Sequence, residues 1–381
     1  MRNTRKLKIQ KIEENSNEVD LEIFGYLHSE MQRQNSANSH EYKNSYIYLE
    51  DFNNSLLKLY YNYIIELLHH LIDKHDLKYN FIIDNSNHLF NNFNGNKTIH
   101  LGVNFEHTLV KKNGRSVPIN CPIGEVISDD NDYYFVRIDN YDNLKKMDYV
   151  FDYSIPNIYN ISQCNVYNEF SKKCIYISPF IFDPNKIHFN NTRKNDVITT
   201  FININEPRRR RLYDVLNHAD LKWINYDNEN INSDAQRMNY ENINNSDAQR
   251  MNYNINNSEA KQMNYNNINN CFEHDELKNL YLNTKIIINI HQTDHHHTFE
   301  ELRVLPALQC GVIVISEESP LYYMVPYNEM IIWCKYNDIV NMTKNVLANY
   351  DFYYNKIFIE KGHILDTLNQ KNIENISKIL E

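Results

Sequence analysis

The stretch KIIINIHQTDHHHTFEELRVLPALQCGVIVISE, from Lys285 to Glu317, decides the fold. It opens with a short apolar run rich in β-branched side chains, which is typical of a buried strand. A second apolar run of this kind follows at Val312–Ile315. Between the two runs lie a polar loop and a helical pattern that ends at Gly311. A strand, a helix and a strand of this length predict a right-handed βαβ crossover in a parallel sheet.

The start of this helix and the edge of the sheet follow from the same stretch. Thr298 and Glu301, three residues apart, match a capping box, so we expect the helix to begin at Thr298. The tract His291–His297 follows the first strand, and Ser316 with Glu317 ends the second. Open α/β sheets bind ligands outside the carboxyl ends of their strands. We therefore expect the functional site at this edge.

Length and charge narrow the class of protein. A chain of 381 residues is long enough for two domains with separate hydrophobic cores. The net charge of −10 and the isoelectric point near 5.9 argue against a nucleic-acid-binding protein, which would normally carry a broad basic surface. The sequence has no stretch near the roughly 20 apolar residues of a membrane span, and its first residues lack the apolar core of a signal peptide. We therefore expect a cytoplasmic protein with no transmembrane segment and no nucleic-acid partner.

Cysteine and glycine usage argues against several common sites. The six cysteines show no C-x-x-C pair or other metal-ligand spacing, which indicates reduced cysteines in a cytosolic protein. Only seven residues are glycine, and neither a dinucleotide-binding nor a P-loop glycine fingerprint occurs. Gly311 is the only glycine between Gly124 and Gly362, so it marks the turn of the βαβ unit as a special position.

The remaining pattern predicts two α/β domains. An amphipathic helix is expected at Ser55–His75, followed by strands separated by loops as far as Ser178. We assign residues 1–185 to an N-terminal domain and residues 186–381 to a C-terminal domain. Within residues 228–270, the sequence NINSDAQRMNY recurs twice with small changes. Because polar repeats with almost no aliphatic residues cannot build a core, we interpret them as a surface insertion in the second domain, disordered or weakly helical.

A run of arginines opens the helix that follows the strand DVITTFINI. Pro207 suits the first helical position, and the run from Arg208 to Arg211 comes directly after it. The positive end of the helix dipole disfavours cations there, so a bound anion such as a diphosphate would stabilise the cluster. A solvated basic patch or a localisation signal would give the same pattern. We take Arg208, Arg209 and Arg210 as candidate phosphate ligands.

Two further pairs of residues lie close to the expected edge. Glu300 and Arg303 are three positions apart at the start of the key helix, where they could form an ordinary helical ion pair. A carboxylate there could also hold sugar hydroxyls, and an arginine could neutralise a leaving phosphate. Ser316 and Glu317 could cap the following turn or line the ligand site. We count all four as candidate ligand-binding residues.

The histidine-rich tract raises the question of a metal. Three adjacent histidines, His295, His296 and His297, cannot all face one ion from a regular element, although a loop could present two of them together with Asp294. The sequence shows no second ligand cluster of recognisable spacing. We therefore predict no bound metal and interpret the tract as a positively charged or hydrogen-bonding loop near a phosphate, with His291 as its best-placed member.

Together these segments resemble a known family. The sequences INIHQTD, FEELRVLPALQC and GVIVISE, with FININEPRRRRLYDVL upstream, are similar to the donor-binding domain of GT-B glycosyltransferases. The similarity is to a branch with a strand ending in N-x-H, then E-x-x-R and V-I-S-E. Two earlier segments, FEHTLV at Phe105–Val110 and DYSIPNIYNI at Asp152–Ile161, resemble acceptor-domain segments of such enzymes. The resemblance covers roughly residues 98–348, apart from the repeat insertion.

The resemblance implies an α/β fold of the GT-B type, with two Rossmann-like domains facing across a cleft. It implies a hexosyltransferase-like enzyme that needs no metal or cofactor. Such an enzyme moves a sugar from a nucleotide-sugar donor to a hydroxyl group of a glycan, lipid or protein acceptor. Arg208–Arg210 would contact phosphate, Glu300 and Arg303 would contact the donor sugar or phosphate, and Ser316 and Glu317 would line the nucleotide.

For the catalytic step, the resemblance points to the first domain. Glu106 or His107 would face the donor and could take the proton from the acceptor hydroxyl. Many GT-B enzymes carry two glutamates eight positions apart around the key helix, but Thr298 and Pro306 occupy those places here. A proline should also kink the helix. The resemblance is thus to a divergent branch, with retaining or inverting stereochemistry left open. A catalytically silent nucleotide- or sugar-binding protein of the same fold and a metal-dependent hydrolase using His291–His297 remain as alternatives.

Overall fold

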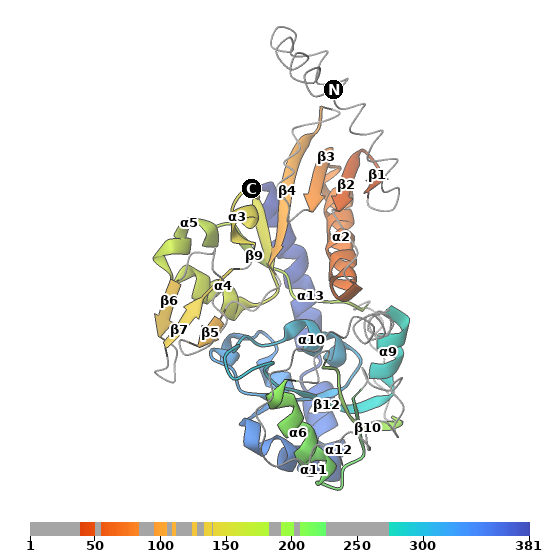
Figure 1. Ribbon diagram of the computed structural model, residues 1–381. Helices are drawn as coiled ribbons and strands as arrows, with labels where there is room; N and C mark the ends of the chain where they lie inside the picture. Colours follow the sequence, from red (N-terminus) through yellow and green to blue (C-terminus); the bar gives the residue numbers. More distant parts are fainter. Residues whose placement is uncertain are drawn as a thin grey trace, which may run out of the picture.

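The structure is a computed structural model. It describes residues 39–49, 55–83, 95–104, 109–111, 124–127, 133–138, 140–182, 192–201, 206–225 and 274–381. Two sheets of mainly parallel strands, with helices beside them, lie one above the other in Figure 1. The chain is therefore an α/β protein, as expected. The repeat insertion lies outside the described residues, and so do Glu106 and His107.

The first part of the chain forms a six-stranded sheet, called the first sheet below, and a small antiparallel sheet. The elements are β1 (Ser39–Tyr42), β2 (Ser45–Leu49), α2 (Ser55–His75), β3 (Tyr79–Ile83), β4 (Lys97–Asn104), β5 (Leu109–Lys111), β6 (Gly124–Ile127), β7 (Tyr133–Val136), α3 (Tyr141–Leu144), β8 (Tyr149–Asp152), α4 (Ile155–Ser162), η2 (Asn165–Tyr167), α5 (Asn168–Ser171) and β9 (Cys174–Tyr176). The first sheet has the order β1-β2-β3-β4-β8-β9, and the small sheet has the order β5-β7-β6.

The first sheet is parallel from β2 to β9, and only β1 pairs antiparallel with its neighbour. Its parallel strands follow one another in chain order, so the described strands contain no reversal of order. Helix α2 spans the predicted residues because its apolar side chains recur at helical spacing. Tyr60, Ile64 and Leu68 all lie on one buried face, in the core that also contains strand residues of the first sheet.

The second part of the chain forms a five-stranded sheet, called the second sheet below. The elements are β10 (Asn195–Thr199), α6 (Pro207–Asn217), β11 (Trp223–Asn225), α9 (His274–Leu282), β12 (Thr284–Asn289), α10 (Glu301–Gln309), β13 (Ile313–Glu317), η5 (Tyr322–Met324), η6 (Asn328–Met330), β14 (Ile331–Cys334), η7 (Tyr336–Asp338), α11 (Ile339–Ala348), α12 (Tyr350–Tyr354), the π-helix η8 (Asn355–Ile359), α13 (His363–Ile376) and η9 (Ser377–Leu380). All five strands run parallel, in the order β11-β10-β12-β13-β14.

The order of the second sheet contains one reversal. Counted along the chain, the strands lie in the order 2-1-3-4-5, which is one of the two common orders of doubly wound sheets. From β10 the chain moves outward to β11 and then returns to the other side of β10 to form β12. The switch point therefore lies between the carboxyl ends of β10 and β12, where such sheets bind ligands.

The predicted βαβ unit is confirmed as β12, α10 and β13. The two strands pair in parallel with Ile286 opposite Ile313 and Asn289 opposite Ser316. Both strands are almost wholly buried, which explains why each reads as a continuous apolar run. Gly311 has a φ of 71°, a left-handed conformation that glycine adopts without steric cost at the end of a helix.

The expected start of this helix was wrong. Helix α10 begins at Glu301, and Glu300 occupies the N-cap position without a side-chain capping bond. The Thr298 hydroxyl instead accepts a hydrogen bond from the backbone N–H of Leu109 in β5, at 3.1 Å. A contact with another part of the chain has therefore replaced the local cap. Pro306 lies inside α10, which continues to its last residue without a break in the helical assignment.

Two sets of contacts join the parts of the chain. Helix α13, near the end of the chain, packs beside α2 and β9 of the first sheet (Figure 1). Asn372 of α13 is fully buried and donates hydrogen bonds to the side chains of Tyr63 and Ser178, at 2.9 and 2.7 Å. Strand β5 meets the histidine tract through a bridge between Val110 and His296. Among the described residues, no helix is both long enough and apolar enough to cross a membrane.

Candidate functional site

Two arginines meet on one aromatic ring at the switch point. Phe201 follows β10, and its side chain is fully buried. The guanidinium carbon of Arg209, from the first turn of α6, lies 4.7 Å from the centre of this ring. That of Arg303, from the first turn of α10, lies 5.2 Å from it. The N-terminal turns of two helices thus bring two positive charges to the carboxyl ends of β10 and β12.

The arginine pair is electrostatically strained. Arg209 is only 3 % exposed. Burial lowers its pKa to about 10, and the neighbouring charge of Arg303 adds to that shift. Arg303 donates a hydrogen bond to Asn289 Oδ1 at 2.9 Å, and its Nη2 lies 3.8 Å from Glu300 Oε2. With a pKa of about 10, Arg209 remains charged at neutral pH, so an anion bound beside the two arginines would stabilise the arrangement.

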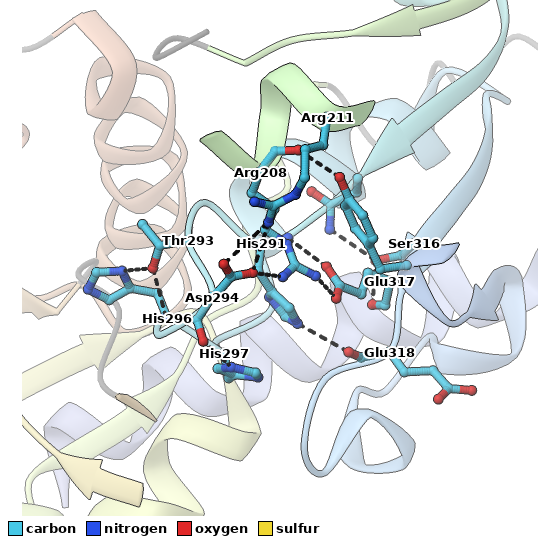
Figure 2. A network of polar contacts seen from close by, with 12 residues as sticks. Arg208, Arg211, His291, Thr293, Asp294, His296, His297, Ser316, Glu317 and Glu318 are labelled. Carbon is cyan, nitrogen blue, oxygen red and sulfur yellow. Dashed lines mark hydrogen bonds and ion pairs between the residues drawn. The ribbon is translucent and has the colours of Figure 1, made fainter. Parts of the chain in front are cut away.

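Arg208 is held differently, by carboxylates of the protein. Figure 2 shows its guanidinium between Asp294 and Glu317. The distance from Arg208 Nη1 to Asp294 Oδ1 is 2.5 Å, and Nη2 forms the ion pair with Glu317. The ring of Tyr336 covers the same guanidinium at 4.3 Å, and its hydroxyl donates to the Arg208 carbonyl at 2.7 Å. The charge of Arg208 is therefore already balanced inside the protein.

The other two arginines of the run, Arg210 and Arg211, are more exposed than Arg208 and Arg209. The side chain of Arg210 is exposed. Arg211 is also exposed and lies 3.3 Å from Asp294. Of the three predicted phosphate ligands, the structure thus brings Arg208 and Arg209 to the edge, and Arg210 faces solvent. Helical spacing explains this division, because adjacent residues of a helix point about 100° apart.

Ser316 and Glu317, two of the predicted ligand-binding residues, form hydrogen bonds at the ends of β12 and β13. Ser316 Oγ accepts a hydrogen bond from Asn289 Nδ2 at 3.0 Å. Glu317 Oε2 accepts one from the backbone N–H of His291 at 3.2 Å. Burial raises the pKa of Glu317, and the Arg208 charge opposes that shift. Both side chains are buried and bind residues of the protein, so in this structure they fix the ends of β12 and β13.

The histidine tract is a hydrogen-bonded loop. His291 Nε2 donates to the Glu318 carbonyl at 3.1 Å, and His297 Nε2 donates to the Asp294 carbonyl at 3.2 Å (Figure 2). Burial lowers the pKa of His297 to about 4, and the nearby His291 adds to the shift. His297 is therefore neutral at pH 7 and gives this loop no positive charge. Within the described part of the chain, no three His, Cys, Asp or Glu side chains are arranged to hold a metal ion.

Sequence reasoning missed several contributors to this site. Phe201 lay inside a predicted strand and read as an ordinary core residue, although it supports both arginines. Tyr336 follows β14 and gave no local signal of its stacking on Arg208. Asn289 was visible in the N-x-H pattern, but its bond to Arg303 depends on how the start of α10 packs against the end of β12.

The two ion pairs of Arg208 should differ in strength. Arg208 and Glu317 are each 11 % exposed, whereas the Asp294 side chain is 57 % exposed. Glu317→Gln should lower the free energy of unfolding by about 3 kcal/mol, because it leaves a largely buried charge less well paired. Asp294→Asn should cost about 1 kcal/mol or less, because water screens that pair. Urea unfolding of the two variants measures the difference, and equal losses would contradict it.

Comparison with known proteins gives one short similarity. No protein-family model matches the chain. Over 78 residues the chain is 36 % identical to "Uncharacterized protein R358" of Acanthamoeba polyphaga mimivirus. The match covers 19 % of this chain and 28 % of that protein, so the chain spans well under a third of its length. The fold and the site together define an α/β protein with two arginines at the switch point of a parallel sheet.

Proposed function

We propose that the chain is a GT-B glycosyltransferase that moves a sugar from a nucleotide-sugar donor to a hydroxyl acceptor. The observation that carries this proposal is the convergence of Arg209 and Arg303 on Phe201 at the switch point. A diphosphate is the anion that suits them best, because guanidinium groups bind phosphate oxygens in bidentate fashion and helix N-termini add their dipoles.

The donor-site roles follow from exposure and partners. The side chains of Arg303 and Glu300 are 12 % and 16 % exposed, so both retain a face toward solvent. Arg303 would contact the diphosphate, and Glu300 would accept hydrogen bonds from sugar hydroxyls. Arg209 would contribute its charge from the interior, where it lies against Phe201. Fixed positive charge at this place stabilises the diphosphate as it leaves.

The acceptor side of the proposal rests on where β5 lies. Leu109 donates its N–H to Thr298 and accepts a hydrogen bond from the N–H of His297 at 3.2 Å. The chain thus reaches the edge of the second sheet two residues after His107. In the proposed reaction, Glu106 or His107 takes the acceptor hydroxyl proton as the oxygen bonds to the anomeric carbon. The bond from that carbon to the diphosphate breaks, and the diphosphate leaves with the electron pair.

A donor panel tests the proposal. UDP-, GDP-, CMP- and dTDP-sugars are titrated into the full chain by calorimetry, and slow hydrolysis of each donor is followed by chromatography. We expect one nucleotide class to bind and its sugar to be released, with no change after chelation of metals. Binding without turnover would favour the silent binding protein instead. The absence of binding by a demonstrably folded protein would refute the donor site.

A further inference from the structure

A pair of buried carboxyl groups lies between the two sheets. Asp152 is the last residue of β8 in the first sheet, and Glu301 is the first residue of α10 beside the second sheet. Both residues are fully buried, at 0 % exposure. Neither forms an ion pair with any residue that the structure describes. Buried carboxyl groups without a cation are costly unless they are hydrogen-bonded or protonated.

Asp152 has several hydrogen-bond donors. The backbone N–H of Ser154 donates to it at 2.8 Å. The side-chain amides of Asn104 and Asn157 donate at 2.7 and 3.4 Å. All of these donors are neutral and belong to the first part of the chain. They lower the pKa of Asp152, but burial outweighs them and raises it to about 7.

Glu301 has fewer hydrogen-bond donors than Asp152. The Tyr327 hydroxyl donates to Glu301 Oε2 at 2.8 Å. The nearby Ser154 hydroxyl lowers the pKa of Glu301, but among the described residues neither Ser154 Oγ nor Glu301 Oε1 has a hydrogen-bond partner. Ser154 therefore bonds Asp152 through its N–H and lies close to Glu301 without a hydrogen bond to it. Burial raises the pKa of Glu301 to about 8, and the nearby Asp152 adds to this shift.

The other titratable groups that face this pair are three phenols and the Cys174 thiol of β9, and both burial and Asp152 raise the pKa of that thiol. Tyr60 of α2 and Tyr176 of β9 lie on the side of the first sheet, and Tyr327 lies on the side of the second. Burial raises the pKa of all three well above the ordinary value of tyrosine. They are uncharged at neutral pH, so they offer no positive charge to a carboxylate.

We propose that Asp152 and Glu301 form a proton-dependent lock between the first sheet and helix α10. The pair holds at least one proton while the two parts are docked, and loss of that proton loosens the contact. The lock does not depend on which ligand the second sheet binds. It places a titratable contact one residue from Glu300, at the helix end that also carries the arginine of the proposed donor site.

The direction of the pH effect follows from the raised pKa values. The folded protein keeps a proton that the unfolded chain has already released. The stability from Glu301 is therefore complete below pH 4.5, the ordinary pKa of glutamate, and is lost as the pH rises toward about 8. Over this window the folding equilibrium constant should fall by up to about tenfold per pH unit.

Urea unfolding of the full chain at pH values from about 5 to about 9 tests the linkage. We expect Glu301→Gln to flatten the pH dependence, because glutamine fits the same space and carries no charge. At pH 8 this variant should be at least about tenfold more favourably folded than the wild type. The exposed Glu360→Gln serves as the matched control and should follow the wild type. A Glu301→Gln curve parallel to the wild type would overturn the proposal.

A second readout tests the docking itself. Trp333 packs on Phe299, two residues before Glu301, with ring centres 4.8 Å apart. Trp223 is the other tryptophan of the chain, so Trp223→Phe leaves Trp333 as the reporter. Its emission should titrate between pH 6 and about 9 while the protein stays folded, and should not titrate when Glu301→Gln is added.

Constant emission in the Trp223→Phe background would overturn the lock. If Glu301→Gln does not fold, infrared spectra of the unaltered protein decide the matter. A protonated buried carboxyl band at pH 6 that vanishes by about pH 9 would support the lock, and its absence at pH 6 would refute it.

Discussion

Arg303→Ala is expected to weaken the binding of the donor nucleotide-sugar by about 100-fold or more. A charged hydrogen bond to phosphate, removed from a partly enclosed site, is worth about 2–5 kcal/mol. Arg303 is the member of the arginine pair that retains exposed surface and a defined orientation, through its bond to Asn289. Calorimetric titration of the nucleotide class found for the wild type measures the loss.

Arg210→Ala is the matched control. It removes the same charge from the N-terminal turn of α6, but its side chain is exposed. We expect its affinity for the donor to stay within about threefold of the wild type at physiological salt, because an exposed charge is strongly screened. Equal losses in the two variants would mean that general positive charge, and not the geometry at Phe201, attracts the ligand.

Arg193→Met is expected to lower the free energy of unfolding by about 3–5 kcal/mol. Arg193 is buried and donates to three carbonyl groups, those of Tyr281 and Thr284 at 2.9 and 2.7 Å and that of Cys310 at 2.7 Å. Tyr281 lies in the last turn of α9, and Cys310 caps α10. The Arg193 cation thus binds carbonyl groups at the negative C-terminal ends of two helices. Methionine would fill the same space but could not make any of these hydrogen bonds.

Thermal and urea unfolding measure this loss, with Lys194→Met as the control. Lys194 is the next residue and carries the same charge, but it is exposed. We expect a change of about 0.5 kcal/mol or less for the control. A small effect of Arg193→Met as well would show that the carbonyl groups find other donors, and that the arginine does not hold the two helices in place.

The parts of the fold that sequence predicted are those set by local pattern. Helix α2 spans Ser55–His75 as expected, because its length and periodicity are complete within one stretch. The unit β12–α10–β13 was predicted because buried parallel strands read as apolar runs and Gly311 marks the turn. The arginines were found for a similar reason, since a strand followed by Pro207 locates a helix start.

The parts that sequence did not predict depend on distant contacts. Thr298 has the composition of a cap, but its hydroxyl is used by Leu109, 189 residues away. The sequence predicted a series of strands as far as Ser178 without their partners, and one of them, β7, pairs antiparallel with β5 and β6 in the small sheet. Short strands carry too little pattern to specify a partner. Likewise, Arg208 and Glu317 were both chosen as ligand contacts, and only the folded chain shows that they bind each other.

The path of α13 has a consequence for how the protein is made. Asn372 of this helix is made 309 residues after Tyr63, yet it completes a buried hydrogen-bond network with Tyr63 and Ser178. The surface of α2 that α13 covers therefore stays exposed during synthesis until the residues of α13 have been made. A fragment ending near residue 185 would never receive this helix. Separate expression of the first part should thus yield a chain prone to aggregation, and adding the α13 segment back should improve its solubility.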